Sequence, residues 1–494
     1  MQNIVEDTNK GRLKATFLDR VVGYISPKAG LERVKARRSY EAASFGRRTK
    51  AFKNASSTGP NLEIAQSFQT LRNRSRHFVR NNGWAKRALG VITDNTIGQG
   101  IRPAPVGTGN QVKKIKAIWH DWAETTACDW YGKNTFYGLQ QLIMSEISEA
   151  GDCLIIRRKV MPDSNNPLPI KLQILEGDQL DHNRNYRLSV NIKGKELPGY
   201  ARLGVQFDDE GRLLGYWVWP QHPYDMSPVI QTIASEFVPV EDVIHPFEIL
   251  RIGQVRGIPD GVAAFMKMSD FSDYEDAQLM RQKVAAAFAA FVTGRSENAS
   301  DDPLEHMEPG IIEYLNENET ITFSSPPKAD GYSEYSKKIL QGIAASYEIT
   351  YEQLTMDYSN VNYTSGQMAR QDTKGRFRKL QYNLIVPQVC VPVWGWFMEA
   401  VQITGKMLIP VVCNAMDWTA PKIAPLDYVK ETNARIAAIS AGLTTWSEVI
   451  REEGRDKDEF LEEYKRDMED LKKAGVNFTS VQMVPPETKI AVNE

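Results

Sequence analysis

The chain has 494 residues, of which 42% are hydrophobic and 25% charged, a composition that excludes wholesale disorder, collagen and coiled-coil rods. Its formal net charge of -2 argues against a simple basic nucleic-acid binder. The cysteines Cys128, Cys153, Cys390 and Cys413 are widely spaced, which excludes a zinc-binding pattern or a disulfide framework and fits a reducing compartment.

The charge is spread unevenly along the chain. Residues 1–90 hold 19 Lys or Arg against 6 Asp or Glu, a balance of +13, whereas residues 444–494 hold 8 against 13, a balance of -5. Such asymmetry is typical of chains that meet polyanions or charged partners, although a solvated basic tail explains it equally well. Residues 1–59 are predicted to form a poorly ordered basic arm.

The first half predicts helices followed by strands. Helical patterns run over residues 62–97, with a second helix starting at Trp84, and over 111–128 and 136–150. Gly98-Gln99-Gly100 is a plausible stop for the second helix. Short runs with period two then indicate a mostly antiparallel or mixed sheet, at residues 152–160, 170–175, 213–218 and 237–244.

The second half is mainly helical. One long helical pattern covers residues 261–292 and ends in an Ala-rich stretch, whose small side chains suit close packing around a ring or burial within one chain. A polar, acidic segment follows, with short strands predicted at 310–315 and 320–323. Residues 358–366 are polar and aromatic and are predicted to be irregular. Further helices are predicted at 332–347, 368–405 and 427–473.

The sequence offers little that indicates catalysis. The Walker A, HExxH, GxSxG and kinase patterns are absent, so we predict no enzyme, no metal and no cofactor. Asp178 beside Asp181-His182 can be interpreted as a metal corner, but a structural role is favoured. The apolar residues 384–398 are too few for a membrane span, which needs about 20 residues, and predict a buried helix.

Two features stand out from this background. Arg370, Lys374 and Arg378 are four residues apart and share one helix face. A basic face beside a polar loop can contact a phosphate backbone, and pairing with acidic side chains on a neighbouring helix is an equally good alternative. The second feature is a pair of helices that flank a small acidic insert, an arrangement that suits packing side by side in a ring.

Several short segments stand in a recognisable order along the chain. The most specific are residues 253–259 (GQVRGIP) and 357–365 (DYSNVNYTS). The others are residues 71–76, 95–101, 151–154, 173–178, 309–310 and 344–356. In this order the sequence resembles the lambda-type family of tailed-bacteriophage portal proteins, and the resemblance covers about residues 60–445.

The resemblance implies an α+β portal fold that forms a ring. Its parts are a mixed α/β wing, a long α-helical stem, a small β-containing clip and an α-helical crown. The implied boundaries are the basic N-terminal arm at 1–59, the wing at 60–259, the first stem helix at 260–293, the clip at 294–330, the second stem helix at 331–348, a tunnel loop with a long helix at 349–405, and the crown with the C-terminal tail at 406–494.

The function implied is that of a portal protein in the virion. Its ring of about twelve identical subunits, a dodecamer at the unique capsid vertex, forms the DNA channel for viral DNA packaging and genome ejection. The implied partners are double-stranded DNA bound without sequence specificity, the terminase large subunit, the major capsid and scaffolding proteins, and head–tail connector proteins, with assembly in the host cytoplasm and no membrane. A nucleic-acid-processing enzyme with a basic N-terminal arm is the alternative, and a peripheral membrane protein is a third.

The resemblance also implies where the functional residues lie. The DNA-facing candidates in the tunnel loop are Tyr358, Asn360, Asn362, Tyr363 and Thr364. The DNA-facing candidates on the helix that follows are Arg370, Lys374 and Arg378. The partner-docking candidates in the clip are Arg295, Glu297, Asp301, Asp302 and Glu305. From the residues alone, the acidic cluster Glu297, Asp301, Asp302, Glu305 and Glu308 favours a solvated loop over a divalent-cation site.

Overall fold

A computed structural model describes residues 57–105, 110–163, 166–225, 234–286, 290–293, 320–323, 331–405, 416–421, 428–453 and 457–473, with residues 21–22, 24–28, 50 and 455. The chain divides into two compact units, residues 1–63 and 64–494. The elements below belong to the second unit, apart from the start of α4. Most of the predicted basic arm and most of the predicted clip lie outside the described residues.

Two helices open the larger unit, as the sequence predicts. α4 (Pro60–Asn81) buries Ile64, Phe68, Arg72 and Ser75, which recur on one face at helical spacing. α5 (Gly83–Thr96) begins at Asn82, whose Oδ1 accepts hydrogen bonds from the backbone N–H groups of the next turn. The predicted glycine stop is confirmed, because Gly98 and Gly100 have φ values of +51° and +105°.

The next helices enclose the core. α6 (Asn110–Trp119) continues into a π-helical turn at His120–Glu124 and a 3₁₀ turn at Thr126–Cys128, so the predicted helix at 111–128 is interrupted. α7 (Phe136–Ala150) ends at Gly151, which has a φ of +97°. The aromatic side chains of this region pack edge-on against the later α12, with Trp119 centred 4.9 Å from Phe397.

Two antiparallel sheets follow. β2 (Cys153–Lys159) lies between β3 (Ile170–Glu176) and β10 (Val243–Ile244). The second sheet has the order β6 (Gly199–Arg202), β7 (Val205–Asp208), β8 (Leu213–Val218) and β9 (Glu236–Pro239). β4 (Val190–Ile192) and β5 (Lys195–Leu197) form a separate hairpin. The run predicted at 237–244 is therefore two strands of different sheets, separated by a turn at Val240–Asp242.

The predicted long helix at 261–292 is wrong at its end. α8 (Phe265–Ala286) stops before β11 (Ala290–Thr293), which pairs antiparallel with β12 (Thr320–Phe323). The two strands pair in register, from Ala290 opposite Phe323 to Thr293 opposite Thr320. The strand predicted at 320–323 is confirmed, and the one at 310–315 lies outside the described residues.

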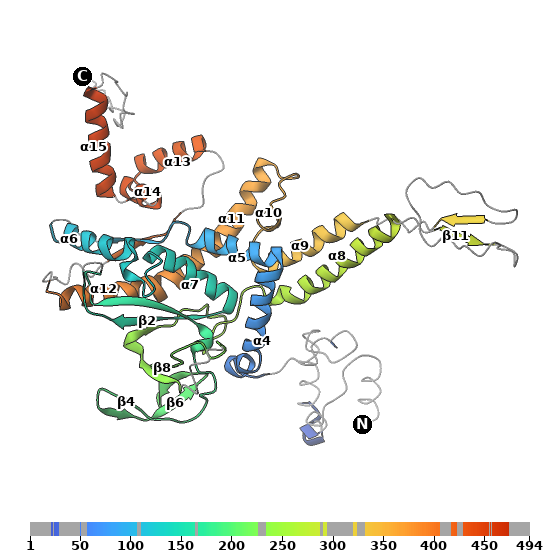
Figure 1. Cartoon of the computed structure of the whole chain (residues 1–494), viewed down its shortest axis with the longest axis horizontal. Coiled ribbons are helices and arrows are strands. Elements are labelled where there is room, and N and C mark those ends of the chain that lie inside the picture. Colours follow the sequence, from blue (N-terminus) through green and yellow to red (C-terminus); the bar gives the residue numbers. More distant parts are fainter. Residues whose placement is uncertain are drawn as a thin grey trace, which may run out of the picture. The chain divides into compact units, whose positions relative to one another are not determined.

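α9 (Tyr332–Ser346) lies beside α8 (Figure 1). Tyr274 of α8 holds the pair together, because its ring centroid lies 4.7 Å from that of Tyr335 and 5.9 Å from that of Tyr332. A Cβ at Gly261, which precedes α8 with a φ of +69°, would lie within 2.1 Å of the Tyr347 ring. This glycine therefore permits the close approach of the two segments.

The longest helical segment is assembled from three parts. α11 (Tyr363–Lys379) runs into π-helical turns at Leu380–Cys390 and then α12 (Val391–Ile403). The wide turns hold Pro387, which lacks the N–H that a regular helix needs. The helix is long and apolar enough to cross a membrane, but 61% of its apolar window is buried inside the protein. This burial agrees with the core helix that the sequence predicts.

The C-terminal part of the chain contributes a strand that pairs near the first helices. β1 (Arg102–Pro105) pairs antiparallel with β13 (Met416–Thr419), so residues more than 300 positions apart form one ladder. α13 (Tyr428–Ser440), α14 (Trp446–Glu452) and α15 (Lys457–Lys473) follow, as the sequence predicts. Arg451 on α14 donates from Nε to the Thr419 hydroxyl at 3.1 Å and so ties α14 to β13.

Candidate functional site

The segment between α10 and α11 is short and internally braced. α10 (Tyr351–Thr355) begins with a capping box between Thr350 and Gln353 and ends at Met356, which has a φ of +58°. Asp357 Oδ1 then accepts from the backbone N–H of Ser359 at 3.0 Å and from its hydroxyl at 2.6 Å. These hydrogen bonds hold the pKa of Asp357 below its ordinary value, so the carboxylate stays charged.

Residues 356–362, called here the tunnel-loop segment, present their polar side chains to solvent. Tyr358 is 60% exposed, and Asn360 and Asn362 are exposed as well. Asn362 is the N-cap of α11, with its Oδ1 accepting from the Ser365 N–H at 2.8 Å. The irregular segment predicted at 358–366 is thus too long: Tyr363 and Thr364 already belong to α11, because the Asn362–Ser365 capping box starts the helix.

A bidentate ion pair fixes α11 to the loop that follows β10. Arg376 donates from Nη1 to Glu248 Oε1 at 2.6 Å and from Nη2 to Oε2 at 2.7 Å, and Lys379 Nζ lies 2.7 Å from Glu248 Oε1. Burial alone would raise the pKa of Glu248, but these two cations hold it below its ordinary value. Burial raises the pKa of the neighbouring Asp260 to about 6, against the opposing charge of Arg376.

The basic residues of this helix fall into two groups. Arg376 and Lys379, which lie off the predicted face, are paired with Glu248, a residue outside the helices. Lys374 and Arg378 are exposed, and no ion pair joins either to an acid among the described residues. They line a shallow recess with Asn95 and Tyr382, while Arg370 is half-buried.

A buried ionic cluster joins α4 to the residue that precedes β2. Asp152 receives Arg256 Nε on Oδ2 at 2.7 Å and the guanidinium of Arg72 on Oδ1, and all three side chains are fully buried. His245 places Nε2 3.3 Å from the same carboxylate. Burial would raise the pKa of Asp152, but Arg256 and Arg72 hold it well below its ordinary value.

Glycines make room for this cluster. A Cβ at Gly177 would lie 2.0 Å from Asp152 Oδ1, and one at Gly257 would lie 1.8 Å from the Gly151 carbonyl oxygen. Arg256 Nη2 also donates to the Gly177 carbonyl at 2.6 Å. Three of the sequence segments that carry the resemblance, around residues 152, 177 and 256, therefore meet at one point. Sequence reasoning missed the cluster, although these motifs contained its members.

The possible metal corner at Asp178, Asp181 and His182 does not form. Asp178 Oδ2 lies 2.8 Å from Arg76 Nη2, whereas Asp181 Oδ2 accepts from the Ser235 hydroxyl at 2.6 Å. A different trio, Glu176, Asp178 and His222, brings its ligand atoms within 4.8 Å of one another. The Arg76 guanidinium already pairs with both carboxylates of that trio, which opposes a cation there.

The clip candidates Arg295, Glu297, Asp301, Asp302 and Glu305 lie outside the described residues.

Residues 45–381 match the family model described as phage portal protein, lambda family. The chain belongs to the lambda family of phage portal proteins. The matched residues include the buried cluster, the tunnel-loop segment and all of α11. The DNA-packaging role that the sequence predicts is thereby confirmed at the level of the family.

Relatives of the portal protein share its length. It is 21% identical to the probable portal protein of Halomonas phage phiHAP-1, with 84% of this chain and 82% of the relative covered. It is also 21% identical to portal protein B of Escherichia phage lambda, over 88% of this chain and 90% of the relative. Such coverage means that the similarity extends over whole chains rather than over one domain.

The solved structures that match this chain include those of gene transfer agent particles. The neck of the native particle, computed with C12 symmetry, contains a chain that matches with a TM-score of 0.44 and 13% identity, covering 82% of this chain and 97% of that one. The neck of the empty particle, computed with C6 symmetry, gives a TM-score of 0.46 and 12% identity, covering 80% and 98%.

Proposed function

We propose that this portal protein assembles into a closed ring of about twelve subunits at the capsid vertex, and that the tunnel-loop segment lines the channel through which double-stranded DNA passes. The family match over residues 45–381 is the observation that carries the proposal. The regions 60–259, 260–293, 294–330, 331–348 and 406–494 would serve as wing, first stem helix, clip, second stem helix and crown. The clip would dock the terminase large subunit and the head–tail connector proteins.

The side chains of the tunnel-loop segment favour weak contact with passing DNA over tight binding. Residues 351–369 contain no Lys or Arg, and their acids are Glu352 and Asp357. Affinity for DNA comes mainly from cations that neutralise phosphates, and a ring multiplies every such charge by the number of its subunits. A loop of exposed tyrosine and asparagine side chains without a cation would therefore touch DNA without holding it.

An exposed apolar loop supports assembly of subunits. Ile249, Leu250 and Ile252, called here the apolar loop, are 60%, 60% and 100% exposed. Gln254 holds this loop in place, because its Oε1 accepts from the backbone N–H groups of Leu250 and Arg251 at 3.0 and 3.1 Å. A rigid apolar projection of this kind is typical of a surface that a partner covers, and a neighbouring subunit is the partner that a ring supplies.

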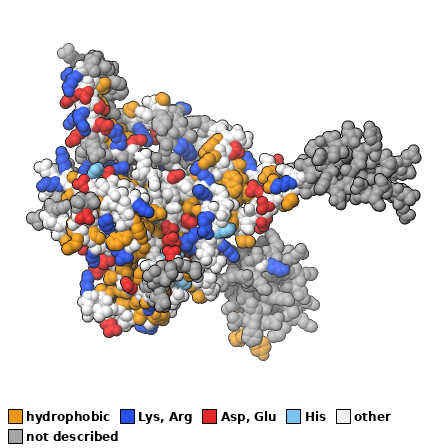
Figure 2. Space-filling view, viewed as in Figure 1, with side chains coloured by type: hydrophobic (Ala, Val, Ile, Leu, Met, Phe, Trp, Pro, Cys, Tyr) orange, Lys and Arg blue, Asp and Glu red, His pale blue; other side chains and the backbone are white. Residues whose placement is uncertain are grey.

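The surface charge also fits a conduit. On the face shown in Figure 2, Lys and Arg side chains are interspersed with Asp and Glu side chains. The acids considered for a metal-dependent nuclease are paired with cations, Asp178 with Arg76 and Asp181 with Arg184. This pairing disfavours the alternative of a nucleic-acid-processing enzyme.

Electron microscopy of the purified full-length chain, combined with light scattering, tests the proposal. We expect rings with a mass about twelve times that of the 55.8 kDa chain. A chain that stays monomeric at high concentration would contradict the proposal. Shortening residues 358–361 should leave the rings intact and reduce packaging or retention of DNA; loss of folding would mean that this segment belongs to the core.

A further inference from the structure

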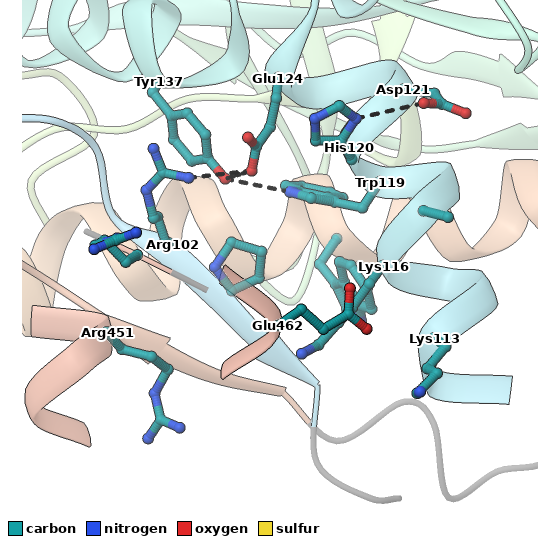
Figure 3. Close-up of a pocket in the computed structure, with 14 residues that line it drawn as sticks. Arg102, Lys113, Lys116, Trp119, His120, Asp121, Glu124, Tyr137, Arg451 and Glu462 are labelled. Atoms are coloured by element: carbon teal, nitrogen blue, oxygen red, sulfur yellow. Dashed lines mark hydrogen bonds and ion pairs between the residues drawn. The ribbon is translucent and has the colours of Figure 1, made fainter. Parts of the chain in front are cut away.

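A cavity of about 390 Å³ opens between α6 and the C-terminal helices α14 and α15. This volume lies within the range of about 300–1,000 Å³ that is usual for small-molecule sites. The cavity has an aromatic end and a charged end (Figure 3). The aromatic end holds Arg102, Trp119, Glu124 and Tyr137, and the charged end holds Lys113, Lys116, Arg451 and Glu462.

The acid at the aromatic end is already neutralised. Arg102 Nη1 donates to Glu124 Oε1 at 3.1 Å, and the Tyr137 hydroxyl donates to the same oxygen at 3.2 Å. The Arg102 guanidinium also lies over the Tyr137 ring, 4.5 Å from its centroid. The negative charge of Glu124 is therefore already paired with Arg102 and does not attract a cation into the cavity. Trp119 and Trp394, whose ring centroids lie 5.1 Å apart, also line the cavity at this end.

The charged end presents cations from both walls. Lys113 on α6 is exposed, and no acid pairs with it among the described residues. Arg451 on the opposite wall donates from Nε to the hydroxyl of Thr419, a neutral partner, at 3.1 Å. The lining residues assigned to this end are three cations, Lys113, Lys116 and Arg451, and one acid, Glu462. The cavity thus carries a positive excess at the end away from its aromatic wall.

We propose that this cavity binds a small phosphate ester with a planar ring, of the nucleoside monophosphate class. A phosphate monoester carries between one and two negative charges near neutral pH, which matches cations on two walls. The ring would lie against the aromatic end while the phosphate meets Lys113 and Arg451. A single inorganic phosphate would satisfy the cations but leave most of the volume unfilled.

Binding at this position would couple two parts of the fold. α6 belongs to the part of the chain before the sheets, whereas Arg451 belongs to the C-terminal helices. A ligand that contacts both would hold α14 and α15 against α6. Bound ligand should therefore slow amide hydrogen exchange in residues 446–473.

Titration calorimetry on the full-length protein tests the proposal with adenosine monophosphate, adenosine and inorganic phosphate. We expect the monophosphate to bind and to bind at least about tenfold more tightly than either of the others. Lys113→Glu should weaken its binding at least about tenfold. Lys114→Glu is the matched control, because Lys114 is exposed on the same helix but does not line the cavity.

Several results would overturn the proposal. They are absence of binding at millimolar monophosphate, equal affinity for adenosine, equal affinity for inorganic phosphate, or equal losses in Lys113→Glu and Lys114→Glu. If Lys113→Glu folds poorly, Arg451→Gln tests the opposite wall of the cavity instead. Unchanged hydrogen exchange in residues 446–473 on saturation would exclude a ligand that joins the two walls.

Discussion

Nε of Arg256 lies 2.7 Å from Oδ2 of Asp152, and both side chains are fully buried. Arg72 binds the other oxygen of the same carboxylate. Three segments distant in sequence are therefore joined through one buried charge. Through this cluster, α4 and the loop before α8 are held in place relative to each other.

Replacing Asp152 by asparagine should destabilise the protein strongly. The substitution leaves two guanidinium groups buried without their carboxylate, and removing one partner of a buried pair costs about 3–5 kcal/mol. Urea unfolding of the full chain measures this loss. Asp209→Asn, which removes the exposed partner of Arg187, is the control and should unfold almost as the wild type does. Equal stability of the two variants would refute the structural role of Asp152.

Glu146 should make stability depend on pH near neutrality. Burial raises its pKa to about 7 from an ordinary value of 4.5, although Arg76 opposes the shift. The folded state thus binds this proton more tightly than the unfolded state. Its contribution to stability is fully present below about pH 4.5 and is lost as the pH rises through about 7.

Unfolding free energies of Glu146→Gln, measured at several pH values across that window, test this assignment. The variant should show a flatter profile than the wild type and should gain relative stability at the alkaline end. Asp94→Asn alters an exposed acid and should follow the wild-type profile. A Glu146→Gln profile as steep as that of the wild type would mean that another group titrates.

The two faces of α11 should respond differently to substitution. Arg376→Met breaks a bidentate pair with Glu248 and should lower the free energy of unfolding by about 3 kcal/mol or more. Lys374→Met and Arg378→Met remove exposed charges and should change it by no more than about 0.5 kcal/mol. If these two face DNA, they should reduce packaging while ring assembly stays normal. Normal packaging in both variants would exclude that role.

The sequence predicts the helices of this fold better than it predicts the pairing of its strands. α5, α7 and α9 carry strong apolar periodicity and clear stops, such as Gly98, so their positions follow from local pattern. β1 is too short and too rich in proline to be recognised, and it becomes a strand only because β13 lies beside it. The false helical end at 290–292 has the same cause: the partner strand β12 decides the structure of β11.

The candidate site likewise has some features that the sequence predicts and others that it does not. Exposure of Tyr358 and Asn360 follows from polar residues between two helical patterns. By contrast, which basic residues of α11 are free could not be predicted, since Glu248 lies 128 positions from Arg376 and reaches it only in the folded chain. The Asp152–Arg256 pair spans 104 positions in the same way. Tertiary ion pairs of this kind leave no local periodicity to detect.

A lysine in the tunnel-loop segment should raise the affinity of the channel surface for DNA. Asn360→Lys adds one cation per subunit, and a ring would carry about twelve of them facing DNA. Assembled rings of the variant should bind short duplex DNA more tightly than wild-type rings, with a steeper dependence on salt. Thr70→Lys adds the same charge at an exposed position of α4. Similar gains in both variants would contradict a channel-lining position for Asn360.

The apolar loop offers a direct test of subunit contact. Ile252→Glu places a charge at a side chain that is 100% exposed in the single chain, so folding should be unaffected and thermal unfolding of the subunit should remain close to that of the wild type. If a neighbouring subunit covers the loop, the buried charge should shift the population from rings to monomers, as measured by light scattering. Met161→Glu changes another apolar side chain that is 88% exposed and serves as the control. Rings of normal mass and stability from Ile252→Glu would show that this loop faces solvent in the assembly.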